Sequence, residues 1–146
     1  MGLKIPKVMI AAVKSGSGKT TITCAFLKQL LCRKKQPVSF KCGPDYIDPM
    51  FHEQVLKIPS KNLDTFFSDA LQIQALYEME LPGHDIAVLE GVMGLYDGLG
   101  GIREEGSSYH LAKTLDVPII LVVDARGMGK SVIPLIAGFL QYVRRS

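Results

Sequence analysis

The chain has 146 residues, of which 47% are hydrophobic and 21% are charged, and its formal net charge is +3. These values are typical of one soluble globular domain with a sizeable core, and they exclude a disordered chain or a strongly basic nucleic-acid-binding protein. Since no apolar run approaches the roughly 20 residues of a membrane-spanning helix and the N-terminus lacks a signal-peptide core, we expect a cytoplasmic protein with neither a membrane nor a nucleic-acid partner.

The first predicted elements are a buried strand over Val8–Val13 and a helix over Lys19–Leu31, joined by a loop of small residues. This is the layout of a phosphate-binding loop, in which Ser15–Gly18 let backbone N–H groups converge on a triphosphate at the positive end of the helix. Lys19 is then expected to reach the β- and γ-phosphates, and the Thr20 hydroxyl to bind Mg²⁺. The residues expected to contact the nucleotide are Ser15, Gly16, Ser17, Gly18, Lys19, Thr20 and Thr21.

The loop departs from the pattern G-x-x-x-x-G-K-S/T at its first position, where Val13 replaces glycine. Lys14 stands five residues before Lys19, and the segment Lys14–Thr20 resembles the deviant phosphate loop of the dethiobiotin synthetase, nitrogenase iron protein and partitioning ATPase superfamily. A Gly/Ser turn that binds nothing is the competing interpretation. The strand before the loop, the helix after it and the paired glycines favour the phosphate loop.

A second strand is predicted over Pro37–Lys41, followed by a turn-rich loop that holds two carboxylates, Asp45 and Asp48. The prolines on either side restrict the backbone, which suits a loop that holds acids in place. They suit a plain connection between two elements equally well, and composition does not separate these readings. The next predicted elements are a helix over Pro49–Lys57 and a helix capped by Ser68 and ending at Glu80.

A third strand over His84–Glu90 leads into a glycine-rich loop over residues 91–101. Glu90 is the first acid past the apolar part of this strand, where loop-type nucleotidases place an acid that holds Mg²⁺ directly or through water. The alternative is an acid that merely reaches solvent. Asp97 lies among glycines that let the backbone approach a ligand, but Asp-Gly is also a common turn pair, and the sequence leaves both readings open.

The segment Asp124–Ser131 is a second candidate loop, because it follows a predicted strand, opens a helix and ends in Gly-Lys-Ser. It has Asp124 where the first glycine should stand, and Ala125 where the deviant loop has lysine. We rank it below the first loop, either as a secondary anion-contacting turn or as an ordinary strand-to-helix turn.

Apolar strands that alternate with helices predict an α/β fold with a parallel sheet covered on both faces. The remaining elements are a helix capped by Ser107 or Ser108 and ending at Leu115, a fourth strand over Val117–Asp124 and a helix over about Lys130–Val143. Ligands of such sheets lie beyond the carboxyl ends of the strands. The residues that follow the predicted strand ends are Lys14–Thr20, Asp45, Asp48, Glu90, Asp97 and Asp124.

Three segments, Ser15–Thr21, Lys41–Pro49 and Leu89–Gly98, together resemble the cobyrinic acid a,c-diamide synthase family. The strings Gly-Pro-Asp-Tyr-Ile-Asp-Pro and Glu-Gly-Val-Met-Gly-Leu-Tyr-Asp-Gly carry the resemblance, which spans essentially the whole chain. It implies a three-layer P-loop NTPase fold of the dethiobiotin synthetase type with a mainly parallel sheet. It also implies that residues 1–146 are the N-terminal synthetase domain of a longer chain, truncated at the C-terminus before a glutaminase domain.

The activity that this resemblance implies is ATP- and Mg²⁺-dependent amidation of the c and a carboxylates of cobyrinic acid. The reaction passes through acyl phosphates, and the ammonia comes from glutamine through the C-terminal glutaminase domain. The resemblance places the acids of the second and third segments at the phosphoryl-transfer and ammonia-addition site. The catalytic residues that it implies are Lys14, Lys19, Asp45, Asp48 and Asp97, and the metal ligands are Thr20, Asp45 and Glu90.

Two other functions stay open from the sequence. One is a partitioning-type switch ATPase, in which Lys14 reaches into the nucleotide of the other subunit of a homodimer. The other is a nucleotide-binding fragment that binds ATP without turnover. The switch reading leaves the loop of Asp45 and Asp48 without a role, which favours the synthetase.

Overall fold

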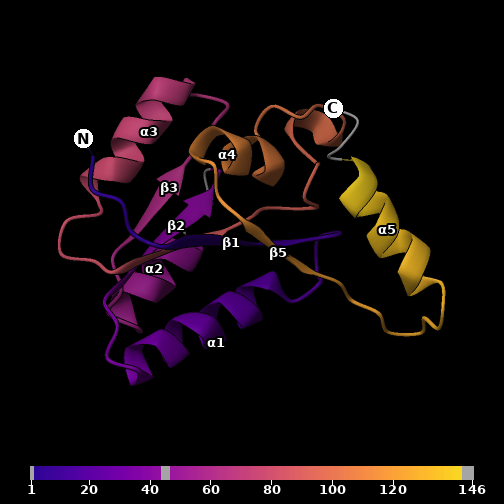
Figure 1. Cartoon of the computed structure of the whole chain (residues 1–146), viewed down its shortest axis with the longest axis horizontal. Helices are drawn as coiled ribbons and strands as arrows, with labels where there is room; N and C mark the ends of the chain where they lie inside the picture. Colours follow the sequence, from indigo (N-terminus) through magenta and orange to yellow (C-terminus); the bar gives the residue numbers. More distant parts are fainter. Residues whose placement is uncertain (1, 44–46, 143–146) are drawn as a thin grey trace.

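The computed structural model describes residues 2–43 and 47–142, with the backbone alone for residues 47–49. The centre is a five-stranded sheet in the order β3-β2-β4-β1-β5, with parallel pairing throughout (Figure 1). The strands are β1 (Lys7–Ala12), β2 (Pro37–Cys42), β3 (Ser60–Leu63), β4 (Ile86–Glu90) and β5 (Ile119–Val122). The helices are α1 (Lys19–Cys32), α2 (Ile47–Gln54), α3 (Ala70–Met79), α4 (Ser108–Leu115) and α5 (Val132–Tyr142), with a 3₁₀ turn at Leu99–Gly101.

The central strands of the sheet are buried because helices cover both faces of the sheet there. Successive residues of a strand point to opposite faces, and in β1 Met9 belongs to one hydrophobic cluster whereas Ile10 belongs to the other. The first cluster includes Ile73 of α3 and Leu111 of α4, and the second includes Leu27 of α1. In Figure 1, α3 and α4 lie above the sheet and α1 and α2 lie below it. The expected three-layer α/β fold is confirmed.

Because the strands are parallel, the carboxyl ends of the central strands lie at the same end of the sheet. We call this end the rim. Glu90 at the end of β4 is in register with Ile10 of β1 and with Lys41 of β2. The loop after β4 then continues along β1, because the Leu95 N–H donates to the carbonyl of Ala12 at 2.8 Å. The segments that follow β1, β2 and β4 therefore start side by side.

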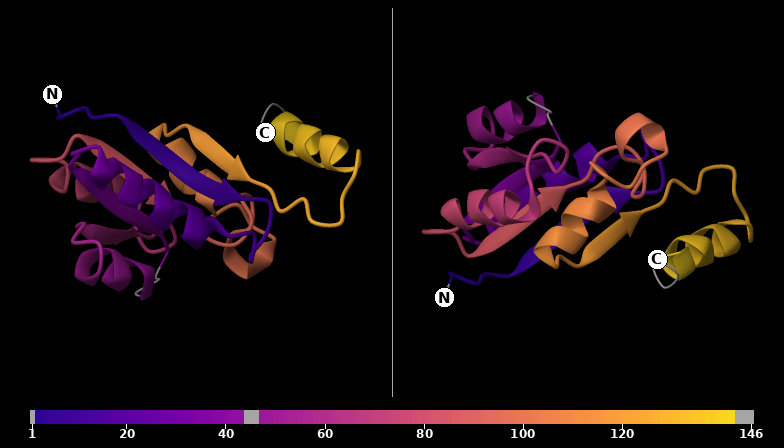
Figure 2. Two further views of the ribbon diagram at one scale, coloured as in Figure 1. Left: turned by 90° about the horizontal axis from the view of Figure 1, so that it is seen from below. Right: turned by 90° about the horizontal axis from the view of Figure 1, so that it is seen from above.

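The last helix, α5, stands to one side of the sheet (Figure 2). No residue between Val132 and Tyr142 is buried. The helix is joined to the loop after β4 by Tyr96, whose hydroxyl donates to the carbonyl of Phe139 at 2.7 Å. The Tyr96 ring also packs against the Phe139 and Tyr142 rings, with centroid distances of 5.4 and 4.6 Å. None of the helices in the described ranges is long and apolar enough to cross a membrane.

The prediction of four strands was wrong, because the structure adds a fifth, β3, at the edge of the sheet next to β2. Its sequence, Ser-Lys-Asn-Leu, contains one apolar residue, and only Ser60 and Leu63 are buried. Edge strands are commonly short and carry charged side chains, here the exposed Lys61, because these features prevent pairing with other chains. Hydrophobic pattern therefore gave no signal for it.

Helix starts were predicted to within a few residues. The N-cap of α3 is Asp69, not Ser68: the Asp69 carboxylate accepts from the N–H of Gln72 at 2.8 Å, and the Gln72 side chain accepts from the N–H of Asp69 at 3.0 Å. This reciprocal pair satisfies two donors at the helix start. For α4, the cap is Ser107, whose Oγ accepts from the N–H of His110 at 3.0 Å.

Candidate functional site

The loop between β1 and α1 presents an open backbone surface. Gly16 and Gly18 have φ angles of 75° and 91°, a region that residues with a Cβ adopt only with strain. A Cβ on either glycine would meet no further atom within 4 Å, so there is room for a ligand in front of the loop. The Ser17 hydroxyl donates to the carbonyl of Lys14 at 2.8 Å and closes the turn. Ser15 is exposed on the same loop.

Lys19 is the first residue of α1, and its side chain reaches the loop that follows β4. The residue is 9% exposed, and its Nζ donates to the carbonyl of Met93 at 3.1 Å. Met93 belongs to the glycine-rich segment of the sequence, so this bond joins two of the three motifs. Thr20 and Thr21 follow on the first turn of α1, and both are exposed.

Glu90 is the last residue of β4, as in the predicted strand over His84–Glu90, and it is fully buried. Its Oε2 lies 2.7 Å from Nζ of Lys41, the residue beside it in β2, and the two side chains are 0% and 6% exposed. The reading of Glu90 as an acid that merely reaches solvent is therefore wrong. Burial alone would disfavour a charged carboxylate, whereas the Lys41 ammonium stabilises it.

Asp97 closes a turn in the loop after β4. Its Oδ2 accepts from the N–H of Gly94 at 3.1 Å, and its own N–H donates to the carbonyl of Gly94 at 3.0 Å. Gly94 packs tightly on the start of the phosphate loop, because a Cβ there would lie 2.7 Å from the carbonyl oxygen of Val13. The turn-forming role of Asp97 is confirmed, and its role in catalysis stays a prediction.

Lys14 lies on the side of the phosphate loop that faces the end of β5. It is exposed and lines a cavity of about 200 Å³ together with Ser17 and Asp124. The Asp124 carboxylate accepts from the Arg126 guanidinium at 2.6 Å and from the Arg126 N–H at 3.1 Å. These hydrogen bonds lower the pKa of Asp124 to about 2. Within this second candidate loop, Lys130 is exposed.

The two acids predicted after β2 are only partly covered by the structure. Asp45 lies outside the described residues. Asp48 is in the first turn of α2, and its side chain is not described. The backbone places the start of α2 one short segment after the end of β2, so Asp48 follows the strand that carries Lys41. The assignments of Asp45 and Asp48 stay predictions.

The donor set at the rim fits a magnesium ion in its chemistry. Mg²⁺ prefers oxygen ligands such as hydroxyls and carboxylates, which Thr20 and Glu90 supply, and the Lys41 ammonium favours the charged form of Glu90. Among the side chains that the structure describes, no group of three or more His, Cys, Asp or Glu side chains is placed to hold a metal ion.

Three contacts at the rim were not anticipated from the sequence. Lys41 was part of the second motif without a role, and the Met93 carbonyl was not expected to accept from Lys19. Ser108 was considered only as a helix cap, but its Oγ accepts from the N–H of Val92 at 2.7 Å and donates to the Val92 carbonyl at 3.1 Å. The first contact depends on β2 and β4 being neighbours in the sheet, which the sequence did not show. Backbone carbonyls carry no sequence signal.

Comparison with known proteins gives a family match over most of the chain. The CbiA model, described as the CobQ/CobB/MinD/ParA nucleotide binding domain, matches residues 8–140. Curated relatives include proteins named cobyrinate a,c-diamide synthase from Gloeobacter violaceus, 46% identical over 135 residues, and from Methanococcus maripaludis, 42% identical over 136 residues. A third, from Synechocystis, is 42% identical over 134 residues.

These alignments cover 92%, 93% and 90% of this chain, in that order, but 30%, 30% and 28% of the relatives. The chain thus spans less than a third of the length of the relatives that it matches. The resemblance read from the three motifs is confirmed.

Proposed function

The chain belongs to the CobQ/CobB/MinD/ParA nucleotide binding domain family, and we propose that it is the ATP-binding synthetase part of a cobyrinate a,c-diamide synthase. In this proposal residues 1–146 bind Mg·ATP and a carboxylic acid substrate, cobyrinate. A glutaminase domain outside these residues supplies ammonia.

One observation carries the proposal. The ammonium of Lys19, from the phosphate loop, is hydrogen-bonded to the carbonyl of Met93 in the glycine-rich motif at 3.1 Å. The phosphate loop and the glycine-rich motif are therefore in contact, which supports a shared site. Beside them lies a buried acid, Glu90, held by Lys41. A turn that bound nothing would not require a buried Lys19 whose ammonium contacts the glycine-rich motif.

ATP would lie with its triphosphate on the loop Ser15–Gly18 and its γ-phosphate at Lys19. The open space in front of Gly16 and Gly18 supports this placement, as does the positive end of α1. Thr20 and Thr21 on the first turn would complete the phosphate contacts. Lys14, on the exposed side of the loop, is proposed to contact the γ-phosphate or the acyl phosphate.

Mg²⁺ bound at this rim would neutralise charge on the β- and γ-phosphates during transfer. We propose that Thr20, Glu90 and Asp45 hold it, directly or through water. Lys41 would keep Glu90 ionised and in place.

The reaction itself needs little acid–base help in its first step. A substrate carboxylate is ionised at neutral pH, so one of its oxygens attacks the γ-phosphorus and the bond to the β–γ bridging oxygen breaks. This gives an acyl phosphate and ADP. Ammonia then attacks the carbonyl carbon, phosphate leaves, and loss of a proton gives the amide. Lys19 supplies charge stabilisation and alignment for the transfer.

Asp48, Asp97 and Asp45 are proposed to lie around the acyl phosphate and the incoming ammonia. Carboxylates there would orient ammonia and accept a proton from the nitrogen once it has attacked. Asp97 already has one oxygen bonded to the N–H of Gly94, so it would act from a fixed turn.

The experiment uses the chain with ATP, MgCl₂, ammonium chloride and cobyrinic acid labelled with ¹⁸O in its carboxylates. Free ammonium replaces the glutaminase domain. The expected result is an amide by mass spectrometry, with one ¹⁸O transferred to inorganic phosphate for each amide formed. Lys19→Ala serves as the inactive control.

Other outcomes decide between the alternatives. ATP hydrolysis that is stimulated by a second protein and unaffected by cobyrinic acid would favour the switch ATPase. Binding of ATP and cobyrinic acid without amide would leave a nucleotide-binding fragment. Amide formation without ¹⁸O in phosphate would contradict the acyl phosphate.

A further inference from the structure

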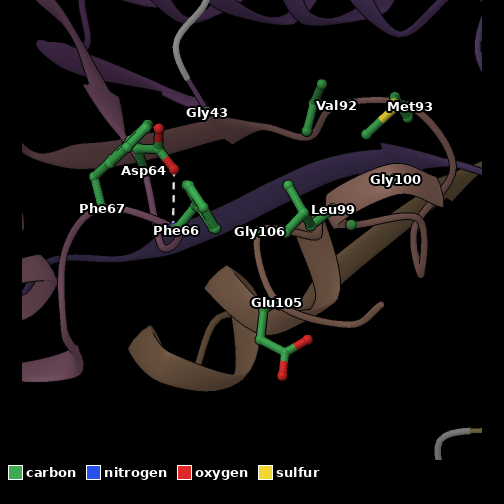
Figure 3. A pocket seen from close by; sticks show the side chains of 11 residues that line it. Gly43, Asp64, Phe66, Phe67, Val92, Met93, Leu99, Gly100, Glu105 and Gly106 are labelled. Atoms are coloured by element: carbon green, nitrogen blue, oxygen red, sulfur yellow. Dashed lines mark hydrogen bonds between the residues drawn. The ribbon is translucent and has the colours of Figure 1, made fainter. Parts of the chain in front are cut away.

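A largely apolar pocket opens on the rim beside the phosphate loop, and the reaction above assigns no role to most of its lining. It has a volume of about 380 Å³ and is shown in Figure 3. We call it the rim pocket. It is lined by Gly43 after β2, Asp64, Phe66 and Phe67 after β3, Val92 and Met93 after β4, and Gly98, Leu99, Gly100, Glu105 and Gly106 in the following loop.

Two adjacent phenylalanines form one side of the rim pocket. Phe66 and Phe67 are 49% and 77% exposed, and their rings meet edge to face with centroids 4.7 Å apart. The turn that carries them is fixed, because the N–H of Phe66 donates to Oδ1 of Asp64 at 2.9 Å (Figure 3). Phe66 also lies over Gly106, where a Cβ would be 3.8 Å from the Phe66 Cβ. The aromatic pair is therefore held against the pocket by its own turn.

Exposed apolar side chains continue along the pocket. Leu99 and Met93 are 43% and 38% exposed, and Figure 3 shows Phe66 and Leu99 between the Asp64 turn and the Met93 end. Clustered exposed apolar groups are costly in water, and in a concave surface they mark a binding site. The rim pocket thus suits a ligand with a broad apolar face.

One residue of the rim pocket, Met93, contacts the lysine that follows the phosphate loop. The Met93 side chain lines the pocket, and the Met93 carbonyl accepts from Nζ of Lys19. A ligand in the pocket that extends past Met93 would therefore bring its near end to the lysine assigned to the γ-phosphate.

Charge sets the orientation of an acidic ligand. The charged side chains among the residues that line the rim pocket are Asp64 and Glu105, and in Figure 3 the Glu105 carboxylate lies on the side of the pocket away from Met93. A carboxylate next to either acid would be repelled, whereas the Lys19 ammonium at the Met93 end attracts it. A ligand with an apolar body and a carboxylate would place its carboxylate toward Lys19.

We propose that Phe66 and Phe67 form the surface that receives the ring system of the corrinoid substrate, and that they determine specificity for it. The inference rests on the proposed function, which supplies cobyrinate as the substrate. A pocket of about 380 Å³ takes only the part of such a ring that lies next to the carboxylate at Lys19, and the outward face of Phe67 contacts the part that stays outside. An aromatic side chain offers a large, rigid apolar face against which such a ring can pack.

The test compares cobyrinic acid binding to wild type, Phe67→Ala, Phe67→Tyr and a matched control, Leu71→Ala, by isothermal titration calorimetry with ADP and MgCl₂ present. Leu71 is 78% exposed, against 77% for Phe67, lies on the neighbouring helix α3, and does not line the rim pocket. Both positions are exposed, so neither truncation threatens the fold. We expect Phe67→Ala to weaken cobyrinic acid binding roughly tenfold, the usual effect of truncating an important aromatic side chain at a binding surface. Phe67→Tyr and Leu71→Ala should bind as wild type does.

A second titration with ATP separates this inference from the proposed function. All four proteins should bind Mg·ATP equally. Wild type that binds cobyrinic acid no better than Phe67→Ala overturns the role of the phenylalanines and leaves the proposed function intact. Wild type that binds Mg·ATP but not cobyrinic acid overturns the substrate and this inference with it.

Discussion

Nζ of Lys41 lies 2.7 Å from Oε2 of Glu90, in a pair of buried side chains that joins the ends of β2 and β4. The pair stands where two motifs of the sequence meet. Because β1 is the other neighbour of β4, the pair also lies one strand away from the start of the phosphate loop. This ion pair thus joins the second motif to the third motif at the rim.

Replacement of Lys41 by methionine should destabilise the fold by about 3–5 kcal/mol, because it leaves the Glu90 carboxylate buried without its cation. The measurement is urea unfolding of wild type and Lys41→Met at pH 7. The double variant Lys41→Met/Glu90→Gln should recover much of the stability, since neither charge remains buried. A single variant within about 1 kcal/mol of wild type would show that the pair is not a structural link.

Gly94 should not tolerate alanine, because a Cβ there would lie 2.7 Å from the carbonyl oxygen of Val13. We expect Gly94→Ala to reduce the stability by about 1–3 kcal/mol through this overlap and to weaken Mg·ATP binding by displacing the phosphate loop. Gly138→Ala is the matched control, since a Cβ at that position in α5 meets no atom within 4 Å. Thermal unfolding of the two variants tests the difference, and equal stabilities would refute the close approach.

The three thiols should differ in reactivity. Burial raises the pKa of Cys42 from 9.0 to about 12, whereas Cys32 is exposed. At pH 8 an alkylating reagent should label Cys32 within minutes and leave Cys42 intact, because the thiolate is the reactive form. Peptide mapping by mass spectrometry identifies the labelled residue, and Cys42 should react once the chain is unfolded in urea. Rapid labelling of Cys42 in the folded protein would contradict the burial.

The same shift predicts a decrease in stability at alkaline pH. A folded-state pKa above the unfolded value means that the folded protein holds the thiol proton of Cys42 more tightly. The contribution of this protonated thiol to stability is therefore complete below pH 9, and it is lost as the pH rises toward 12. Burial raises the pKa of Tyr77 to about 12 as well, from 10.0, which acts in the same direction. Urea midpoints measured from pH 8 to 11 should fall steadily. Urea midpoints that do not change between pH 8 and 11 would contradict this prediction.

The sequence predicted the sheet and the phosphate loop because both have strong local signals. Apolar runs in β1 and β4 cannot be exposed, and the loop with Gly16 and Gly18 has few other uses. The edge strand β3 was missed because Ser60–Leu63 carries little hydrophobic pattern. Local signals therefore identified the centre of the sheet better than its edge.

The long-range contacts at the site could not be predicted from the sequence. Glu90 could be placed at a strand end, but its burial and its pairing with Lys41 depend on strand order, since β4 lies between β1 and β2. The two phenylalanines after β3 gave no signal at all, because their position on the rim follows from a strand that was not predicted. The acid Glu90 at the end of a predicted strand was found, whereas its partner Lys41 and the phenylalanines after the missed strand were not.

The central claim is that the loop of Lys19 is the nucleotide site and that the similar Gly-Lys-Ser segment after β5 is not. Calorimetric titration of Mg·ATP into wild type, Lys19→Ala and Lys130→Ala tests it most directly. Lys130 is exposed and is the lysine of the Gly-Lys-Ser end of the second candidate loop, so its variant is the matched control. We expect one site in wild type, binding weakened at least about tenfold in Lys19→Ala because a charged hydrogen bond to phosphate is removed, and unchanged binding in Lys130→Ala. Wild-type affinity in Lys19→Ala, or weaker binding confined to Lys130→Ala, would contradict it.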